Sequence, residues 1–255
     1  MEYRRNDRID PKNYVYGIRA VIEAIDSGKD IDKVMIRRDL TGDLIRELMA
    51  KIKEYDIPMQ KVPQEKLNRI TMKNHQGAIA LLSPVKYQRL EHLVPLFYEE
   101  GRNPLVLILD GITDTRNFGA IGRSADCAGV DAIVIPERNS VSVTPDALKT
   151  SAGGLFYVLV CREKSIVEAV RYLRDNGYRI VAATEKGAED YTKADYTVPV
   201  AIVMGNEETG IGDEVLRMSD DLAAIPMRGN IGSLNVSVAA GVMLYEAVRQ
   251  RMITE

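Results

Sequence analysis

The sequence of 255 residues contains two cysteines, two histidines, three phenylalanines and no tryptophan. Cys127 and Cys161 are too few for a disulfide framework and are most simply small buried hydrophobic groups in a reducing compartment. His75 and His92 are the only histidines. The sequence therefore offers no ligand set for a zinc site, and we expect no metal.

Long apolar segments are also missing. The longest apolar stretch, residues 238–245 with Gly241 inside it, is far shorter than the roughly 20 residues that cross a membrane. The first ten residues carry charges without an apolar core, so we expect no secretory signal and a cytoplasmic location. With 45% hydrophobic and 28% charged residues, the composition is that of a folded globular chain and excludes a mainly disordered or fibrous one.

Charge is distributed unevenly along the chain. Residues 1–90 contain 18 Lys and Arg against 13 Asp and Glu (+5), whereas residues 91–255 contain 16 against 24 (−8), and the two sum to the net charge of −3. The asymmetry suggests two tasks on one chain. The basic part could contact a phosphate backbone, but its charges could equally lie on solvated helix faces and a loose tail. The candidates for phosphate contacts are Arg4, Arg5, Arg8, Arg37, Arg38, Lys66, Arg69 and Lys73.

The hydrophobic pattern of residues 11–88 predicts a small α/β module, preceded by a flexible basic tail, residues 1–10. Residues 89–103 are interpreted as a linker with at most one short helix. Within the module we expect a helix from Ile18 to Ile25, strands over residues 33–36 and 78–82, and a second helix over residues 43–55.

From Pro104 onward the strand-like segments become continuous apolar runs, separated by helical segments or long loops. Such runs are typical of a parallel sheet covered on both faces, so residues 104–255 are predicted to form a doubly wound α/β domain. The expected strands are residues 105–109, 132–135, 156–160, 179–183 and 198–204.

Two helix starts and the burial of the last helix can be predicted in this part of the chain. Thr144 precedes Pro145 at a first helical position, and Ser165 with Glu168 forms a capping box. The last helix, about residues 235–251, is apolar or small until Glu246. This pattern predicts a helix that is buried on all sides, both in the core and at a subunit interface.

The phosphate-binding signatures of common nucleotide sites are absent. There is no G-x-G-x-x-G after residues 105–109 and no G-x-x-x-x-G-K-[ST], which disfavours ordinary NAD and ATP sites. Instead, three polar segments that contain glycine lie at or just past the ends of predicted strands, where open α/β sheets bind ligands. These are the first motif (residues 110–125), the second motif (residues 204–212) and the third motif (residues 225–241).

In this order and spacing, the three motifs resemble those of the SpoU (TrmH-type) RNA ribose 2′-O-methyltransferases. The module before them is similar to the RNA-binding domain of the RlmB-like 23S rRNA guanosine-2′-O-methyltransferases, including Tyr16-Gly17 and His75-Gln76-Gly77. The resemblance covers nearly the whole chain. It implies a SPOUT-type domain with a deep trefoil knot, S-adenosylmethionine bound in the knotted loops, and a homodimer with its site near the subunit interface.

The resemblance also implies roles for residues of the first two motifs. Arg123 is expected beside the acceptor ribose, where it orients the phosphate and stabilises the developing alkoxide, since a guanidinium cation is a poor proton acceptor. Asn117 either caps the helix that follows or supports the catalytic site. Glu207 is expected to hold the loop or the arginine, although Glu208 leaves open which acid matters.

In the third motif, Ser233 and Asn235 either cap the last helix or, by resemblance, stand near the methyl group and the target ribose. The cofactor is expected to be held by backbone groups and apolar side chains from several loops, with no metal. The resemblance places Thr184, Gly205, Ile225, Met227 and Leu234 around it.

Three functions are compatible with these observations. The first is 2′-O-methylation of a guanosine in 23S rRNA, and the second is the same reaction on tRNA. The third is a non-catalytic RNA-binding protein of ribosome assembly on the same scaffold. The presence of all the expected catalytic residues argues against this third function.

Overall fold

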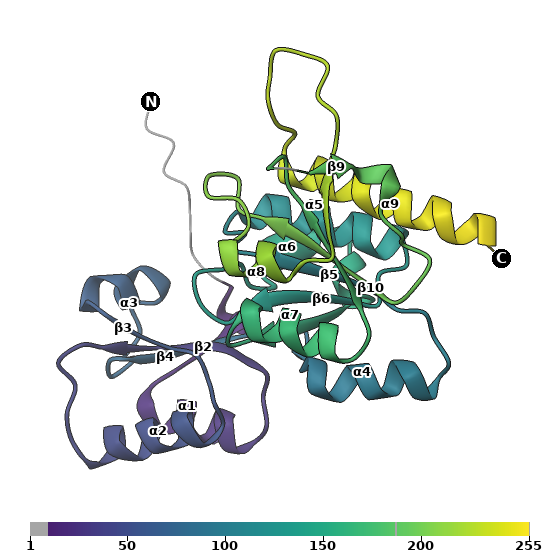
Figure 1. Cartoon of the computed structure of the whole chain (residues 1–255). Coiled ribbons are helices and arrows are strands. Elements are labelled where there is room, and N and C mark those ends of the chain that lie inside the picture. Colours follow the sequence, from purple (N-terminus) through teal and green to yellow (C-terminus); the bar gives the residue numbers. More distant parts are fainter. Residues whose placement is uncertain (1–9, 187, 255) are drawn as a thin grey trace. The chain divides into compact units, whose positions relative to one another are not determined.

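The computed structural model describes residues 10–186 and 188–254 (Figure 1). The chain divides into two compact units, with the boundary between Lys86 and Tyr87. Residues 1–9 of the expected basic tail, including Arg4, Arg5 and Arg8, lie outside the described residues. In the two described ranges, no helix is both long enough and apolar enough to cross a bilayer.

The first unit is a four-stranded sheet with helices on both faces, which confirms the small α/β module. Its strand order is β1-β4-β2-β3, in which β2 and β3 are parallel and the other neighbours are antiparallel. In chain order its elements are a 3₁₀ turn Pro11–Asn13, β1 (Tyr14–Tyr16), α1 (Ile18–Asp26), β2 (Ile31–Arg37), α2 (Asp43–Glu54), β3 (Met59–Val62), α3 (Gln64–Ile70) and β4 (Ala78–Leu82).

The two faces of this sheet are covered unequally. Val34 and Ile36 of β2 pack with the apolar sides of α1 and α2. Met35, between them in the chain, points to the opposite face and packs in a smaller cluster with Leu67 of α3. Because α3 has only seven residues, it covers less of its face than α1 and α2 cover of theirs.

Tyr16-Gly17 and His75-Gln76-Gly77 meet at the start of α1. The side-chain oxygen of Gln76 accepts a hydrogen bond from the backbone N–H of Ile18 at 3.1 Å. This contact satisfies a helix N–H that Gly17, the N-cap residue, cannot satisfy because it has no side chain. The imidazole Nδ1 of His75 accepts from the backbone N–H of Gly77 at 3.0 Å, so one local structure joins the two sequence segments.

The second unit contains a seven-stranded parallel sheet of order β7-β6-β5-β10-β8-β11-β9, which confirms the predicted α/β fold class. In chain order its elements are α4 (Leu90–Glu99), β5 (Leu105–Asp110), α5 (Thr115–Cys127), β6 (Ala132–Pro136), α6 (Pro145–Thr150), a 3₁₀ turn Gly154–Phe156, β7 (Leu159–Glu163), α7 (Ile166–Asp175), β8 (Arg179–Ala183), β9 (Glu189–Asp190), a 3₁₀ turn Tyr191–Lys193, β10 (Val200–Gly205), α8 (Asp213–Met218), β11 (Asp221–Ala224) and α9 (Val236–Thr254).

Helices cover both faces of this sheet: α4 and α7 lie on one face, and α5, α6 and α9 lie on the other (Figure 1). Four apolar residues of α4 belong to the core on the first of these faces: Leu90, Leu93, Val94 and Phe97. The segment 89–103, interpreted above as a linker, is therefore part of the second unit for most of its length.

The predicted strand 156–160 is displaced along the chain, since the observed strand β7 is Leu159–Glu163. Ala152 and Gly153 have φ angles of 51° and 90°, so the chain turns here before the strand begins. Phe156 and Tyr157 are 60% and 79% exposed. The strand includes the charged residues Arg162 and Glu163 because β7 lies at the edge of the sheet. There the carboxylate of Glu163 accepts a hydrogen bond from the backbone N–H of Leu90 at 2.9 Å.

Both predicted helix starts are confirmed. The hydroxyl of Thr144 accepts from the backbone N–H of Ala147 at 3.2 Å, and the hydroxyl of Ser165 accepts from that of Glu168 at 3.3 Å.

In the single chain the last helix is buried on one side only, and its predicted burial at a subunit interface stays a prediction. Ala240, Met243, Leu244 and Ala247 are fully buried, but Val238, Tyr245 and Met252 are 52%, 53% and 71% exposed. The reason is that α9 packs with one side only, against α5 and β10.

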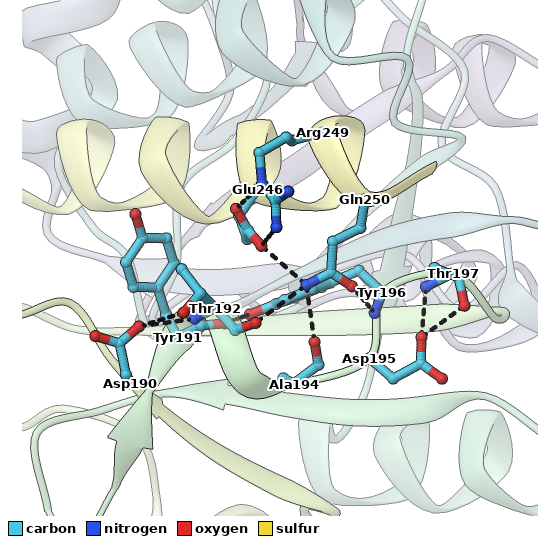
Figure 2. A network of polar contacts seen from close by, with 10 residues as sticks. All are labelled: Asp190, Tyr191, Thr192, Ala194, Asp195, Tyr196, Thr197, Glu246, Arg249 and Gln250. Atoms are coloured by element: carbon cyan, nitrogen blue, oxygen red, sulfur yellow. Dashed lines mark hydrogen bonds and ion pairs between the residues drawn. The ribbon is translucent and has the colours of Figure 1, made fainter. Parts of the chain in front are cut away.

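The C-terminal half of α9 holds the segment that connects β9 and β10 (Figure 2). The side chain of Gln250 accepts from the backbone N–H of Tyr196 at 3.1 Å and donates to the carbonyl of Ala194 at 3.0 Å. It also donates to Glu246, which is 6% exposed and accepts two hydrogen bonds from Arg249 at 2.8 and 2.7 Å. We call Glu246, Arg249, Gln250 and their contacts the buried α9 network.

Candidate functional site

The three motifs begin at the ends of β5, β10 and β11, of which β5 and β10 are neighbours and β11 is separated from β10 by β8. Asp110, at the end of β5, is in register with Gly205, at the end of β10. On the other side of β10, β8 and β11 end at Ala183 and Ala224, so Thr184 and Ile225 leave the sheet at the same edge. This is the carboxyl edge, where parallel α/β sheets bind ligands.

Asp114 caps the helix of the first motif. One oxygen of its carboxylate accepts from the backbone N–H groups of Arg116 and Asn117, both at 2.8 Å. The interpretation of Asn117 as the helix cap is therefore wrong, and its side chain is available for another contact.

One side chain from each motif takes part in a chain of hydrogen bonds. The amide of Asn235 donates to the side-chain oxygen of Asn117 at 3.0 Å, and the amide of Asn117 donates to a carboxylate oxygen of Glu207. These partners are 118 and 90 positions apart in the sequence. We call Asn117, Glu207 and Asn235 the motif cluster. Glu207 and Asn235 are exposed and Asn117 is partly buried, so a ligand can reach the cluster.

Asn235 also caps α9, as one of its two interpretations predicts, and its place near the methyl group and the ribose stays a prediction. Its side-chain oxygen accepts from the backbone N–H of Ser237 at 2.9 Å and from the hydroxyl of Ser237 at 2.6 Å. Ser233, two positions earlier, is exposed and makes no side-chain hydrogen bond with other described residues.

A tight turn forms the second motif and separates the roles of its two acids. The side-chain oxygen of Asn206 accepts from the backbone N–H of Glu208 at 2.8 Å, and its amide donates to the carbonyl of Gly111 at 2.7 Å. Glu208 thus contributes a backbone group to the turn, whereas Glu207 places its carboxylate in the motif cluster. Asn206, to which the sequence analysis assigned no role, connects the second motif to the first.

Glycine is required at position 205 because the turn folds back against it. A Cβ atom there would lie 2.3 Å from the carbonyl carbon of Gly210, closer than any real contact. Beyond the turn, the carboxylate of Asp110 accepts from the backbone N–H of Gly212 at 2.9 Å. Asp110 is a second connection that the sequence analysis did not assign, although its place at a strand end was a signal.

Arg123 lies on α5, six positions after Asn117, and is exposed. It forms no hydrogen bond or ion pair with other described residues, and it is not part of the motif cluster. Its backbone is packed closely, since a Cβ atom on Gly154 would lie 3.3 Å from the Cα atom of Arg123. The helix therefore fixes the position of the residue, and its guanidinium remains available to an anion.

The residues expected around S-adenosylmethionine lie at or beyond the same sheet edge. Thr184, Gly205 and Ile225 are partly buried, whereas Met227 and Leu234 are 36% and 38% exposed. The last two belong to segment 226–235, a long loop that extends from the sheet (Figure 1). Backbone groups at the strand ends beside exposed apolar side chains fit an adenosyl group, which has polar ring edges and apolar ring faces.

Comparisons with known proteins agree with this geometry. Residues 104–245 match the SpoU rRNA methylase family, and residues 14–88 match the substrate-binding domain of RNA 2′-O ribose methyltransferases. A relative in Staphylococcus saprophyticus, named as a TrmH family tRNA/rRNA methyltransferase, is 36% identical over 237 residues, which are 93% of this chain and 95% of the relative.

Two similar solved structures contain S-adenosylmethionine. One is an rRNA methyltransferase from Sinorhizobium meliloti, with a TM-score of 0.61 and 28% identity over 93% of this chain and 87% of that one. The other is the SpoU methyltransferase AviRb from Streptomyces viridochromogenes, with a TM-score of 0.59 and 26% identity over 94% and 90% of the two chains.

The parallel sheet, its three converging motifs and the separate substrate-binding domain define an RNA methyltransferase that uses S-adenosylmethionine. The chain belongs to the SpoU rRNA methylase family.

Proposed function

We propose that this protein, in the cytoplasm, methylates the ribose 2′-hydroxyl of a guanosine in 23S rRNA. Family membership supports an RNA methyltransferase, and the rRNA methyltransferase from Sinorhizobium meliloti supports an rRNA substrate. The observation on which the proposal depends is the motif cluster, because it joins the three motifs at one edge of the sheet. S-adenosylmethionine supplies the methyl group when it is bound.

In this proposal, the guanidinium of Arg123 binds the phosphate next to the target ribose and stabilises the negative charge that develops on the 2′-oxygen. Asn117, fixed between Asn235 and Glu207, keeps the motifs in one geometry. The second carboxylate oxygen of Glu207 can accept a hydrogen bond from the guanidinium of Arg123. Ser233 and Asn235 face the methyl group and the ribose.

The proposed cofactor site uses the ends of three adjacent strands. Backbone groups around Thr184, Gly205 and Ile225 bind the polar edges of the adenosyl group, and Met227 and Leu234 cover its apolar faces. The exposure of these two side chains in the single chain is consistent with a surface that a ligand covers.

We also propose a homodimer through the exposed side of α9. Val238, Tyr245 and Met252 are spaced seven residues apart and form one exposed apolar stripe. α5 contacts α9 and also the 3₁₀ turn that ends at the exposed Phe156. Because α5 carries Asn117 and Arg123, a dimer through this surface would place the active site beside the subunit interface.

The test measures transfer of labelled methyl groups from S-adenosylmethionine to transcripts of 23S rRNA and of tRNA. We expect transfer to a guanosine ribose of 23S rRNA, identified by mapping ribose methylation in cells with and without the protein. Arg123→Ala should abolish transfer, while calorimetry shows unchanged binding of S-adenosylmethionine. Turnover by Arg123→Ala at the rate of the unmodified protein would refute this role.

A tRNA substrate is the second candidate, because the name of the Staphylococcus saprophyticus relative includes both RNAs. Transfer to tRNA transcripts alone would favour it. If the protein does not bind S-adenosylmethionine at millimolar concentration, a non-catalytic RNA-binding protein becomes the better account.

A further inference from the structure

The first unit contains a groove of about 540 Å³ on the sheet face that α3 covers in part. Its apolar lining consists of Met35 of β2, Ile70 of α3, Leu81 of β4 and Pro63. Its polar lining consists of Lys33, Gln60, Glu65, Lys66 and Arg69. The volume lies within the range of small-molecule sites, roughly 300 to 1,000 Å³.

The groove follows from the local fold. Lys33 and Met35 are two positions apart on β2, so their side chains point to the same face of the sheet. α1 and α2 lie on the opposite face and do not cover them. On this face, the short helix α3 buries only Leu67 fully, and the gap beside it remains open.

The charge of the groove favours an anion. Lys33, Lys66 and Arg69 carry three positive charges, against the single negative charge of Glu65. None of these three cations has an ion-pair partner among the described residues, whereas Arg46 and Lys51 of α2 pair with Asp43 and Asp26. The nitrogen of Lys66 lies 3.4 Å from the side-chain oxygen of Gln60, which is neutral and leaves the charge unbalanced.

The apolar lining favours a ligand that has an apolar part in addition to a phosphate. A nucleotide combines a flat base, which packs on apolar side chains, with a phosphate, which binds cations. A base within a duplex is stacked between its neighbours and cannot enter a groove of this kind, whereas an unpaired base can.

We propose that this groove binds one unpaired nucleotide of the RNA substrate. Its base packs against Ile70 and Leu81, which are partly exposed, and Lys33, Lys66 and Arg69 hold its phosphate and the adjacent one. The proposal rests on the RNA-methylating function proposed above and assigns recognition of single-stranded RNA to a defined surface of the first unit.

The absence of tryptophan from the chain allows a direct test. Gln60→Trp places a single tryptophan at the edge of the groove, and Ala50→Trp places one on the exposed side of α2 as a control. The probe is a 12-nucleotide single-stranded RNA of mixed sequence, compared with the same sequence as a duplex. We expect the single strand to quench the fluorescence of Gln60→Trp at least threefold more than the duplex does, with no such difference for Ala50→Trp. Equal quenching in both variants would overturn the proposal.

Removal of positive charge from the groove gives a second test, which does not depend on the introduced tryptophan. The full-length Lys66→Ala/Arg69→Ala variant is compared with Arg46→Ala/Lys53→Ala, which also removes two positive charges, from α2. We expect the groove variant to bind the single strand at least tenfold more weakly and the control variant less than threefold more weakly. The slope of log affinity against log salt should fall by about 1.4 for two lost phosphate contacts. An equal loss of affinity in both variants would show that the RNA is attracted non-specifically by positive charge, and it would overturn the proposal.

Methyl transfer to rRNA and tRNA transcripts separates this proposal from the function on which it rests. If the unmodified protein transfers methyl groups and the groove variant has the same KM, the groove is not a substrate site and the enzyme function stands. If no transcript is methylated but the single strand still binds at the groove, the proposed function fails instead.

Discussion

Two polar networks lie at opposite ends of α9, and they combine the same chemical groups. In the motif cluster, the amide of Asn117 donates to the carboxylate of Glu207. In the buried α9 network, the amide of Gln250 donates to the carboxylate of Glu246. The hydrogen bonds of the motif cluster are exposed, whereas Glu246 is 6% exposed.

Burial explains the different roles of the two networks. Both oxygens of Glu246 accept hydrogen bonds from Arg249, and Gln250 bonds to backbone groups of the segment before β10, so no group is left for a ligand. In the motif cluster, Glu207 accepts one hydrogen bond through one carboxylate oxygen, and its other oxygen can still accept one from a ligand. We infer that the exposed cluster serves the reaction and the buried one holds the fold.

The largest expected effect comes from breaking the motif cluster. Glu207→Gln and Asn117→Ala should each lower kcat about 100-fold or more, because the motifs lose their common geometry around the reacting groups. The melting temperature should stay within a few degrees, since the lost contacts are exposed. The matched control is Glu208→Gln, whose side chain lies outside the cluster. An equal loss of kcat in Glu208→Gln would contradict the assignment.

Breaking the buried α9 network should have the opposite result. Gln250→Ala leaves the backbone groups of Tyr196 and Ala194 without their partner, so the free energy of unfolding should fall by about 2–4 kcal/mol. Denaturant titration measures this change. The kcat of the folded variant should remain within about twofold. A large fall in kcat with unchanged stability would mean that the two networks have been assigned the wrong way round.

The pH dependence of stability should also separate the networks. The hydrogen bonds from Arg249 lower the pKa of Glu246 below its ordinary value. The contribution of the ionised carboxylate is therefore complete above the ordinary pKa of a glutamate and is lost as the pH falls through the lowered pKa. Glu246→Gln should be less stable than the unmodified protein at pH 7, and the difference should shrink below about pH 4. A difference that is constant with pH would contradict this role.

Local patterns predicted much of the fold and little of the site. Strands β4 and β8 have the predicted bounds, because buried apolar runs between polar residues are recognisable from sequence alone. β7 was misplaced, since a turn and a sheet edge override the apolar pattern there. The exposed side of α9 could not be predicted either, because hydrophobicity does not say which partner covers a helix. The trefoil knot remains a prediction.

The contacts of the motif cluster were beyond any local pattern. They depend on β10 lying next to β5, which brings Glu207 close to Asn117 across 90 positions. The family resemblance nevertheless points to all three residues of the cluster. It could not separate Glu207 from Glu208, since that choice depends on the turn formed by Asn206.

The smallest expected effect tests how tightly the motif cluster is held. The hydroxyl of Ser237 donates to the side-chain oxygen of Asn235, and the backbone N–H of Ser237 donates to the same oxygen. Ser237→Ala removes only the first bond, which is exposed, so kcat should fall about threefold and stability by about 0.5 kcal/mol. Asn235→Ala removes the helix cap and the bond to Asn117 together, and its kcat should fall as far as that of Asn117→Ala. If Ser237→Ala were as damaging as Asn235→Ala, the serine hydroxyl itself would act in the reaction, and the cluster would include a fourth member.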